Sequence, residues 1–339
     1  MSVYFRPLVS FDPVMPRGAI RLAGGPGWFT HAVRLVRGVA PQTVRTSDIP
    51  TEIAERLSAP RPAIAGLSME RPRIMGILNV TPDSFSDGGL DSGPEQAARR
   101  GAAMVAAGAD LVDIGGESTR PGAATVPEAD EIARVAPVIA ALAPRIAAPI
   151  SIDTRKAEVA RAAVAAGATL VNDVSGFTYD PALAPFCRET ALPVCVMHAQ
   201  GDPQTMQSDP RYDDVLLDVY DFLDGRIAAL TAIGLPRDRI VIDPGIGFGK
   251  TLAHNLSLLN GLALFHGLGC PILLGASRKG FIGRLSGADP ASARMPGSVA
   301  VALAAVAQGV QILRVHDVAE TRQALTLWQA VQSGEADGT

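Results

Sequence analysis

The sequence has little cysteine, few aromatic residues and almost no excess charge. Only three cysteines occur among 339 residues, and none belongs to a C-x-x-C pair. Their odd number and wide spacing argue against a disulfide framework; they are Cys187, Cys195 and Cys270. We expect them to be small core residues of a protein in a reducing compartment, the cytoplasm. The net charge of −4 gives no general attraction to nucleic acid or to anionic membranes.

Long apolar runs and targeting patterns are also missing. No run of 18 apolar residues is free of polar breaks, so we predict no membrane-spanning helix. The N-terminus, MSVYFRPLVSFDPVMPRG, has no basic start followed by an apolar block, so we predict no secretory signal. Both absences favour a cytoplasmic protein.

Three common nucleotide- and metal-binding patterns are absent. The segment Gly249-Lys250-Thr251 resembles the end of a phosphate-binding loop, but Pro244 occupies the position of the first required glycine. No G-x-G-x-x-G joins a strand to a helix at the usual distance from an acidic residue, which argues against a dinucleotide-binding fold. The histidines lack the spacing of zinc ligands.

From Pro72 onward, short apolar segments that end in polar residues alternate with Ala-rich segments typical of helices. The expected strands are Ile74–Val80, Leu111–Gly116, Ile150–Thr154, Leu170–Ser175, Val194–His198, Ile240–Gly245, Ile272–Ser277 and Ile312–Asp317. The expected helices are Glu95–Ala107, Glu128–Leu142, Lys156–Ala166, Pro181–Thr190, Asp213–Ile233, Leu252–Phe265, Gly297–Gln308 and Val318–Val331. Eight repeated β–α units predict a closed (β/α)8 TIM barrel over residues 72–333.

The first 71 residues do not follow this alternation. Thr51–Leu57 is expected to be a short helix, and the Pro-rich segment Ser58–Pro72 is expected to be a linker. We therefore predict an N-terminal extension of unknown role, packed as a small appendage on the barrel, and a C-terminal tail over residues 334–339.

Each expected strand ends in side chains that can bind a ligand, and in a parallel barrel these ends form the active face. One group consists of planar or charged hydrogen-bonding residues suited to a flat heterocycle: Asp153, Asn172, Asp243 and Lys279. A second group consists of cations suited to phosphate: Arg120, Arg314 and His316. The amide oxygen of Asn79 suits Mg²⁺, which takes few protein ligands beside substrate phosphates. Any one of these residues alone is equally consistent with an ion pair at the barrel mouth.

Eight motifs resemble, in order and without internal gaps, those of the dihydropteroate synthase family. They are GILNVTPDSFSDGG, DIGGESTRPGA, SIDTRK, NDVSG, VMHAQGDPQTMQ, DPGIGFGK, GASRKGFIG and RVHDV. The resemblance covers about residues 73–331. It implies a Mg²⁺-dependent transferase of alkyl groups that condenses (7,8-dihydropterin-6-yl)methyl diphosphate with 4-aminobenzoate to 7,8-dihydropteroate and diphosphate. It also implies competition by sulfonamides and a homodimer.

The same resemblance assigns roles to individual positions. It implies that the pterin is held by Asp153, Asn172, Met197, Asp243, Gly275 and Lys279. It implies that the diphosphate is held by Arg314, His316 and Thr119, with Asn79 acting through Mg²⁺. It implies a 4-aminobenzoate pocket made by Phe85, Thr119, Arg120, Pro121, Phe248 and Ser277. The catalytic residues would be Asp153, Lys279, Arg314 and His316, and the loops Thr81–Ser92 and Ser118–Val126 would be lids.

Two other functions compete with this one. A pterin-binding methyltransferase would share the barrel and its carboxylates but would use a corrinoid partner and no diphosphate, which Arg314 and His316 disfavour. A non-catalytic paralogue would bind pterin without turnover. The Ala-rich segment Val299–Ala307 fits either core packing or a dimer seam.

Overall fold

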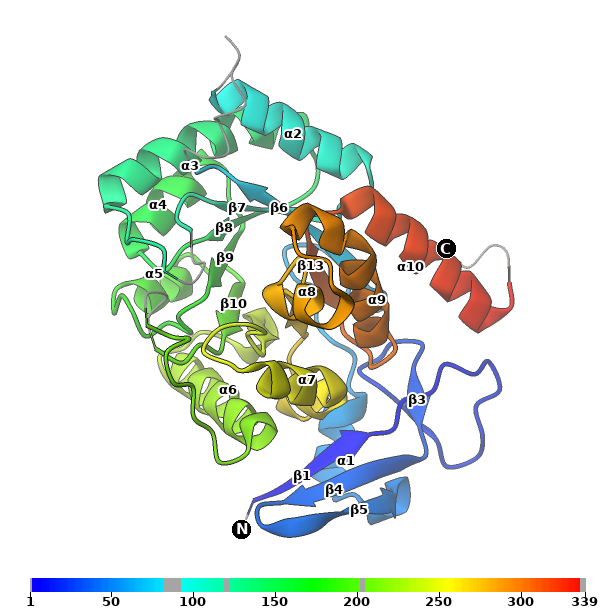
Figure 1. Cartoon of the computed structure of the whole chain (residues 1–339). Coiled ribbons are helices and arrows are strands. Elements are labelled where there is room, and N and C mark those ends of the chain that lie inside the picture. Colours follow the sequence, from blue (N-terminus) through cyan, green and yellow to red (C-terminus); the bar gives the residue numbers. More distant parts are fainter. Residues whose placement is uncertain (1, 82–92, 119–121, 202–204, 336–339) are drawn as a thin grey trace.

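The computed structural model describes residues 2–81, 93–118, 122–201 and 205–335. A ring of strands enclosed by helices begins at residue 73, and a small antiparallel sheet made by the N-terminal residues lies against its lower side (Figure 1).

The central sheet contains eight parallel strands in the order β11-β10-β9-β8-β7-β6-β13-β12. Their bounds are β6 Arg73–Asn79, β7 Leu111–Gly115, β8 Ile150–Asp153, β9 Leu170–Asp173, β10 Val194–Met197, β11 Ile240–Asp243, β12 Leu273–Leu274 and β13 Ile312–Val315. A parallel bridge between Ile242 and Ile272 joins the two ends of the sheet. The predicted (β/α)8 barrel is therefore confirmed.

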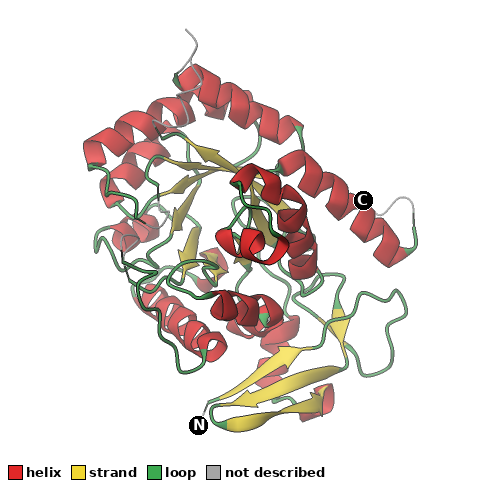
Figure 2. Ribbon diagram, viewed as in Figure 1, coloured by secondary structure: helices red, strands yellow, loops and turns green. Residues whose placement is uncertain are grey.

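Helices surround the strands as an outer layer (Figure 2). They are α2 Pro94–Ala106, α3 Glu128–Leu142, α4 Ala157–Ala166, α5 Leu183–Glu189, α6 Val215–Ala232, α7 Leu252–Asn260, α8 Gly280–Ser286, α9 Met295–Val306 and α10 Val318–Ser333. No helix in the described ranges is long and apolar enough to cross a membrane.

Three of these elements differ from the expected ones. The predicted helix Leu252–Phe265 ends at Asn260, because Gly261 caps it, and a 3-10 helix, η5 Leu262–Leu268, follows. The predicted strand Ile272–Ser277 is reduced to Leu273–Leu274, and helix α8 was not predicted.

The strands separate an apolar layer outside the barrel from a second one inside it. Ile74, Leu78 and Ile114 belong to the cluster that packs against the helices. Alternate residues point inward and form a buried layer at the N-terminal end of the barrel: Met75, Leu111, Leu170, Cys195, Val241, Leu273 and Ile312. Cys195 is thus a core residue, and Cys187 and Cys270 are buried and unpaired as well.

The segment predicted to be a linker closes the lower end of the barrel instead. Ile64 and Met69 are almost fully buried and pack into the inner layer formed by Met75 and its neighbours. The turn between them is fixed by reciprocal backbone hydrogen bonds between Ile64 and Leu67. This segment is therefore packed against the barrel and is not a flexible linker.

The N-terminal extension forms its own sheet, β1 Val3–Pro7, β4 His31–Val36 and β5 Val39–Arg45, with a short hairpin of β2 Ile20–Arg21 and β3 Trp28–Phe29. The predicted short helix is α1 Thr51–Ser58. Tyr4 packs against Leu217 of α6 and Leu264 of η5, and its hydroxyl donates to Asp221 at 2.8 Å. The extension thus packs directly on the barrel.

Candidate active site

The C-terminal ends of the strands bring most of the predicted polar residues to one mouth. Alternation along each strand turns Asp113, Asp153, Asn172, Asp243 and Arg314 inward, above the apolar inner layer. All but Arg314 are less than 10% exposed. The barrel therefore carries an apolar floor and a charged upper layer.

Arg314 is the centre of this layer. Its Nε donates to Asp113 Oδ2 at 2.6 Å, and its Nη2 donates to Asp153 Oδ2 at 2.7 Å. Asn172 Nδ2 donates to the same Asp113 oxygen at 3.2 Å. These two carboxylates raise the pKa of Arg314 above its ordinary value, although burial alone would lower it.

The other oxygen of each carboxylate has no partner. Asp113 Oδ1 and Asp153 Oδ1 are buried and accept no hydrogen bond from the described part of the chain. A buried carboxylate oxygen without a donor is costly, and native structures rarely keep one without a ligand or water. The pair is therefore suited to N–H groups of a bound molecule.

Asp243, Lys279 and Gly275 form the opposite wall of the mouth. Asp243 Oδ1 accepts from the backbone N–H of Gly245 at 2.7 Å, and Lys279 Nζ donates to the carbonyl of Ile246. Burial raises the pKa of Asp243 and lowers that of Lys279 to about 8. A Cβ at Gly275 would lie 3.5 Å from Asp243 Oδ2, so glycine keeps the space beside this carboxylate open.

Phe248 reaches the mouth on the loop that follows β11. The ammonium of Lys279 lies 4.6 Å from the centre of the Phe248 ring. Buried Lys250 fixes the loop, because its Nζ donates to the carbonyls of Gly245 and Phe248 at 2.8 and 2.9 Å. A Cβ at Gly245 would approach the His198 carbonyl oxygen to 1.9 Å, so this turn requires glycine.

His316 and Ser277 meet at the rim, beyond the ends of β13 and β12. The Ser277 hydroxyl lies 3.0 Å from His316 Nδ1 and accepts from the His316 backbone N–H at 3.2 Å. The contact orients the imidazole close to the strand that carries Arg314. An anion at the mouth would therefore meet Arg314 and the imidazole of His316 within three residues of the same chain segment.

Two polar residues at strand ends, His198 and Asp173, face away from the mouth. The ring of His198 contacts Lys250 and packs edge-on against Phe222, and burial lowers its pKa. Asp173 accepts hydrogen bonds from Ser175 and Phe177 and so caps a turn. Alternation along β9 and β10 presents Asn172 and Met197 to the mouth instead.

Asn79 ends β6 and is half-buried at the mouth. The described residues contain no cluster of three His, Cys, Asp or Glu side chains that would hold a metal by themselves. An ion bound at Asn79 would take its remaining ligands from water and diphosphate, which matches the usual preference of Mg²⁺.

Four predicted residues and parts of both predicted lids lie outside the described ranges: Phe85, Thr119, Arg120 and Pro121. The base of the second lid is described. Glu117 Oε1 accepts from the Val126 N–H at 3.0 Å, and Lys156 Nζ donates to the Val126 carbonyl at 2.6 Å. Lys156 also pairs with Glu117 and with fully buried Glu131, so a charge cluster anchors both ends of this loop.

The sequence reasoning missed Asp113 as a member of the binding set. Asp113 is fully buried and accepts from both Arg314 and Asn172. Ser151 was likewise unassigned, and its buried hydroxyl has no partner in the described part of the chain. Position on the strand could have identified both residues. Asp113 precedes Gly115 by two positions and Ser151 precedes Asp153 by two, so each lies on the inward face of its strand.

Replacing Asp153 with asparagine is expected to flatten the pH dependence of stability in the ligand-free protein. Burial raises the pKa of Asp153 from 3.8 to about 7, with Arg314 opposing and Asp113 adding to the rise. Its contribution to stability is therefore complete below pH 3.8 and is lost as the pH rises through about 7. As the pH rises through this window, the free energy of unfolding of the variant should increase relative to that of the wild type by on the order of a few kcal/mol.

Urea unfolding of Asp153→Asn and wild type, each at acidic and alkaline pH, measures this difference. The exposed variant Asp209→Asn is the control and should follow the wild type. Parallel profiles for Asp153→Asn and wild type would show that Asp153 does not titrate in this range.

The chain is similar in sequence to proteins of known function. A family model described as pterin binding enzyme matches residues 75–316. The chain is 46% identical over 269 residues to the dihydropteroate synthase of Escherichia coli (strain K12), covering 79% of this chain and 95% of that one. It is 41% identical over 262 residues to the Bacillus subtilis (strain 168) protein of the same name, covering 77% and 89%.

Solved structures give the same picture. The Xanthomonas albilineans dihydropteroate synthase with 4-aminobenzoic acid aligns with a TM-score of 0.76 and 49% identity, covering 81% of this chain and 98% of that one. Its complex with 7,8-dihydropteroate aligns with a TM-score of 0.74 and 47% identity, over 81% and 99%. The Yersinia pestis enzyme with a sulfonamide drug aligns with a TM-score of 0.75 and 48% identity, over 79% and 96%.

Proposed function

The chain belongs to the dihydropteroate synthase family of pterin-binding enzymes, and from this membership we propose how its own residues share the reaction. The enzyme condenses (7,8-dihydropterin-6-yl)methyl diphosphate with 4-aminobenzoate to give 7,8-dihydropteroate and diphosphate. A carbon–oxygen bond to diphosphate breaks, a carbon–nitrogen bond to the aromatic amine forms, and one proton is released.

The pterin binds between the Asp113–Arg314–Asp153 cluster and Asp243. The observation that carries this assignment is the pair of buried, unpartnered oxygens, Asp113 Oδ1 and Asp153 Oδ1. Ring and amino N–H groups of the pterin supply the donors that these oxygens lack, and Asn172 offers both a donor and an acceptor. Lys279 donates to the pterin carbonyl, Met197 lines the slot, and Gly275 leaves room beside Asp243.

The diphosphate binds at the rim to Arg314 and His316. Only two of the five N–H donors of Arg314 are used by the described residues, so the outer donors are available to an anion. As the bond to diphosphate breaks, charge accumulates on its oxygens, and preorganised cations stabilise that charge more than they stabilise the bound substrate. We infer that departure of diphosphate precedes attack by the amine.

A magnesium ion would be held by Asn79 together with the diphosphate. When bound, it would neutralise charge on the leaving group. The 4-aminobenzoate lies against Phe248 and Ser277, with its amine toward the pterin methylene. Sulfonamides compete for this second pocket, in keeping with the drug complex of the Yersinia pestis relative.

Release of diphosphate is expected only when the dihydropterin diphosphate, 4-aminobenzoate and Mg²⁺ are all present. The measurement is a coupled assay of diphosphate release with each component omitted in turn, and chelation by EDTA should stop it. Asn79→Ala should lower kcat by about 10²–10³, whereas Asn79→Asp should retain a metal dependence. An unchanged kcat in Asn79→Ala would end the metal assignment.

Binding without turnover would identify a non-catalytic paralogue. In that case calorimetry would detect pterin binding while no diphosphate appears. A methyltransferase is disfavoured because the relatives named above are dihydropteroate synthases throughout.

We also propose a homodimer and a cytoplasmic location. The family resemblance favours the dimer, and α9 offers one face buried on the barrel, with Ala302 and Ala305, and exposed alanines such as Ala304 on its other side. The buried, unpaired cysteines are consistent with a reducing compartment.

A further inference from the structure

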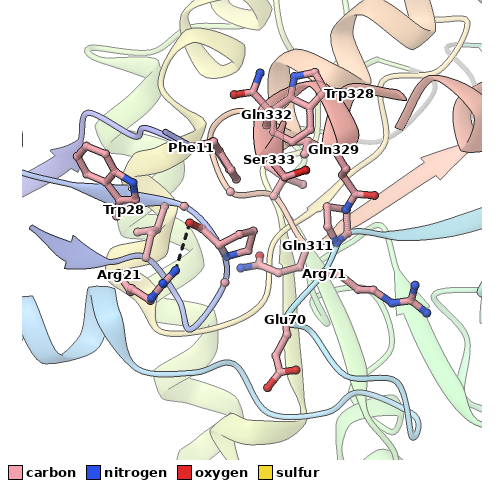
Figure 3. A pocket seen from close by; sticks show the side chains of 18 of the residues that line it. Phe11, Arg21, Trp28, Glu70, Arg71, Gln311, Trp328, Gln329, Gln332 and Ser333 are labelled. Atoms are coloured by element: carbon pink, nitrogen blue, oxygen red, sulfur yellow. Dashed lines mark hydrogen bonds between the residues drawn. The ribbon is translucent and has the colours of Figure 1, made fainter. Parts of the chain in front are cut away.

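A cavity of about 370 Å³ lies between the N-terminal extension and the barrel. Phe11, Arg21 and Trp28 enter it from the extension, and Trp328, Gln329, Gln332 and Ser333 enter from α10 (Figure 3). Its volume falls within the range of small-molecule sites. The family model matches residues 75–316, so both the extension and α10 lie outside it. Only Val306, Gly309, Val310 and Gln311 among the lining residues lie within it.

This cavity is separate from the active site. Gln311 lines it and immediately precedes β13, whereas Arg314 and His316 lie at the other end of the same strand. None of the side chains that form the charged layer at the barrel mouth lines it. A ligand here would therefore not occupy the pterin or the 4-aminobenzoate position.

One polar group aims into the cavity without a partner. Gln311 is only 5% exposed, and its Oε1 accepts from the backbone N–H of Ile272 at 2.9 Å. That bond fixes the orientation of the amide, and Nε2 donates to no residue in the described part of the chain. Figure 3 shows the Gln311 side chain directed into the cavity. Because Nε2 is not among the buried side-chain atoms that lack a partner, solvent reaches it through the cavity. A ligand that brings an acceptor can replace that water without loss of the hydrogen bond.

The remaining lining is aromatic and of mixed charge. Phe11 and Trp328 meet edge to face with ring centres 5.0 Å apart, which leaves flat apolar surface for another ring. Two cationic and three anionic side chains surround the opening: Arg21, Arg71, Asp12, Glu70 and Glu335. Opposite charges in similar number do not select an anion or a cation. They can hydrogen-bond both ends of a neutral amide.

We propose that this cavity binds a small uncharged aromatic carboxamide, with the ring against Phe11 and Trp328 and the carbonyl oxygen accepting from Gln311 Nε2. Every ligand of this class has a flat ring that carries one carbonyl acceptor and an N–H donor.

Intrinsic tryptophan fluorescence can measure binding in the cavity, because the only two tryptophans of the chain, Trp28 and Trp328, both line it. Titration of the full-length protein with benzamide should give a saturable change in tryptophan fluorescence. Cyclohexanecarboxamide lacks the aromatic ring and toluene lacks the acceptor, so each should bind at least about threefold more weakly. Benzoate tests charge and should also bind more weakly. A linear response to benzamide, or equal binding of benzamide and toluene, would overturn the proposal.

Variants separate this site from nonspecific binding. Gln311→Glu keeps an oxygen for Ile272 and removes the donor, so benzamide should bind about threefold to tenfold more weakly. Surface variant Gln42→Glu makes the same change far from the cavity and should bind like the wild type. Phe11→Ala, compared with Val14→Ala on the same loop, gives an independent test if Gln311→Glu is unfolded by circular dichroism. Unchanged binding in a folded Gln311→Glu or in Phe11→Ala would overturn the proposal.

Discussion

Replacing Arg314 with methionine should lower the rate of diphosphate release by about 10²–10³ and also destabilise the ligand-free protein. Two buried carboxylates lose their common partner, since Arg314 bonds Asp113 at 2.6 Å and Asp153 at 2.7 Å. Removing one member of a buried ion pair costs about 3–5 kcal/mol. The loss of stability should be larger at alkaline than at acidic pH, because protonation of Asp153 relieves the unpaired charge.

Steady-state kinetics and urea unfolding of the same preparations separate the two effects. Arg314→Lys keeps the charge but not the planar fork, so its rate should lie between those of wild type and Arg314→Met. Arg322→Met is the matched control, because Arg322 also pairs with a partly buried carboxylate, Asp110 at 2.5 Å, but at the other end of the barrel. Arg322→Met should lose stability and keep the turnover of its folded fraction. A rate within tenfold of wild type in Arg314→Met would contradict the assignment.

Replacing Lys156 with methionine should lower the free energy of unfolding by about 3–5 kcal/mol. Lys156 lies 2.6 Å from Glu131 Oε2 and 3.1 Å from Glu117 Oε2, and all three side chains are almost completely buried. Burial already raises the pKa of Glu131, with Lys156 opposing that rise, so the variant would leave this carboxylate without its main counter-charge. Urea unfolding at neutral pH measures the loss.

A double variant tests the cause. Adding Glu131→Gln to Lys156→Met removes the stranded charge and should recover part of the stability, which a double-mutant cycle resolves. The exposed pair Arg161–Glu158 is the control, and Arg161→Met should cost only about 0–1 kcal/mol. If Lys156→Met costs no more than the control, the cluster does not stabilise the fold.

The barrel was predictable because each strand carries its own evidence. In β6 and β11, buried apolar residues alternate between two apolar layers and end in Asn79 and Asp243. In β8, buried Ile150 and Ile152 face the helices and the strand ends in Asp153. Except in β12, the strand ends lie within one or two residues of the prediction. β12 is shorter than predicted because the chain leaves the sheet at Gly275 and turns at Arg278, whose φ is +58°.

The missed elements lacked a local signal. Helix α8 has seven residues, two of them glycines, and buries Phe281 and Ile282. Strand β5 exposes nearly every residue, so no alternation marks it; pairing with β4 holds it in place. In the sequence, Ile64 and Met69 belong to a Pro-rich segment typical of a linker. Only the closed barrel provides the inner apolar layer against which they pack.

In the candidate site too, features with a local sequence signal were predictable and contacts between distant residues were not. Residue type and position at a strand end predicted which side chains reach the mouth. The pairing of Asp113 with Arg314 spans 201 residues, so only the closed ring reveals that these two groups share one cluster. His198 and Asp173 stay out of the site because a polar residue one position beyond the inward-facing one points the opposite way.

The contact of Tyr4 with Leu217 and Leu264 also affects how the protein folds during its synthesis. Strand β1 leaves the ribosome long before the surface that covers Tyr4, because Tyr4 and its hydrogen-bond partner Asp221 are separated by 217 positions. At ordinary rates of synthesis that interval lasts roughly 10–40 s. During it the nascent N-terminal sheet exposes the apolar face that it will later bury. The N-terminal sheet is thus synthesised well before the surface on which it packs, and its apolar face stays open to other contacts until α6 and η5 have been made.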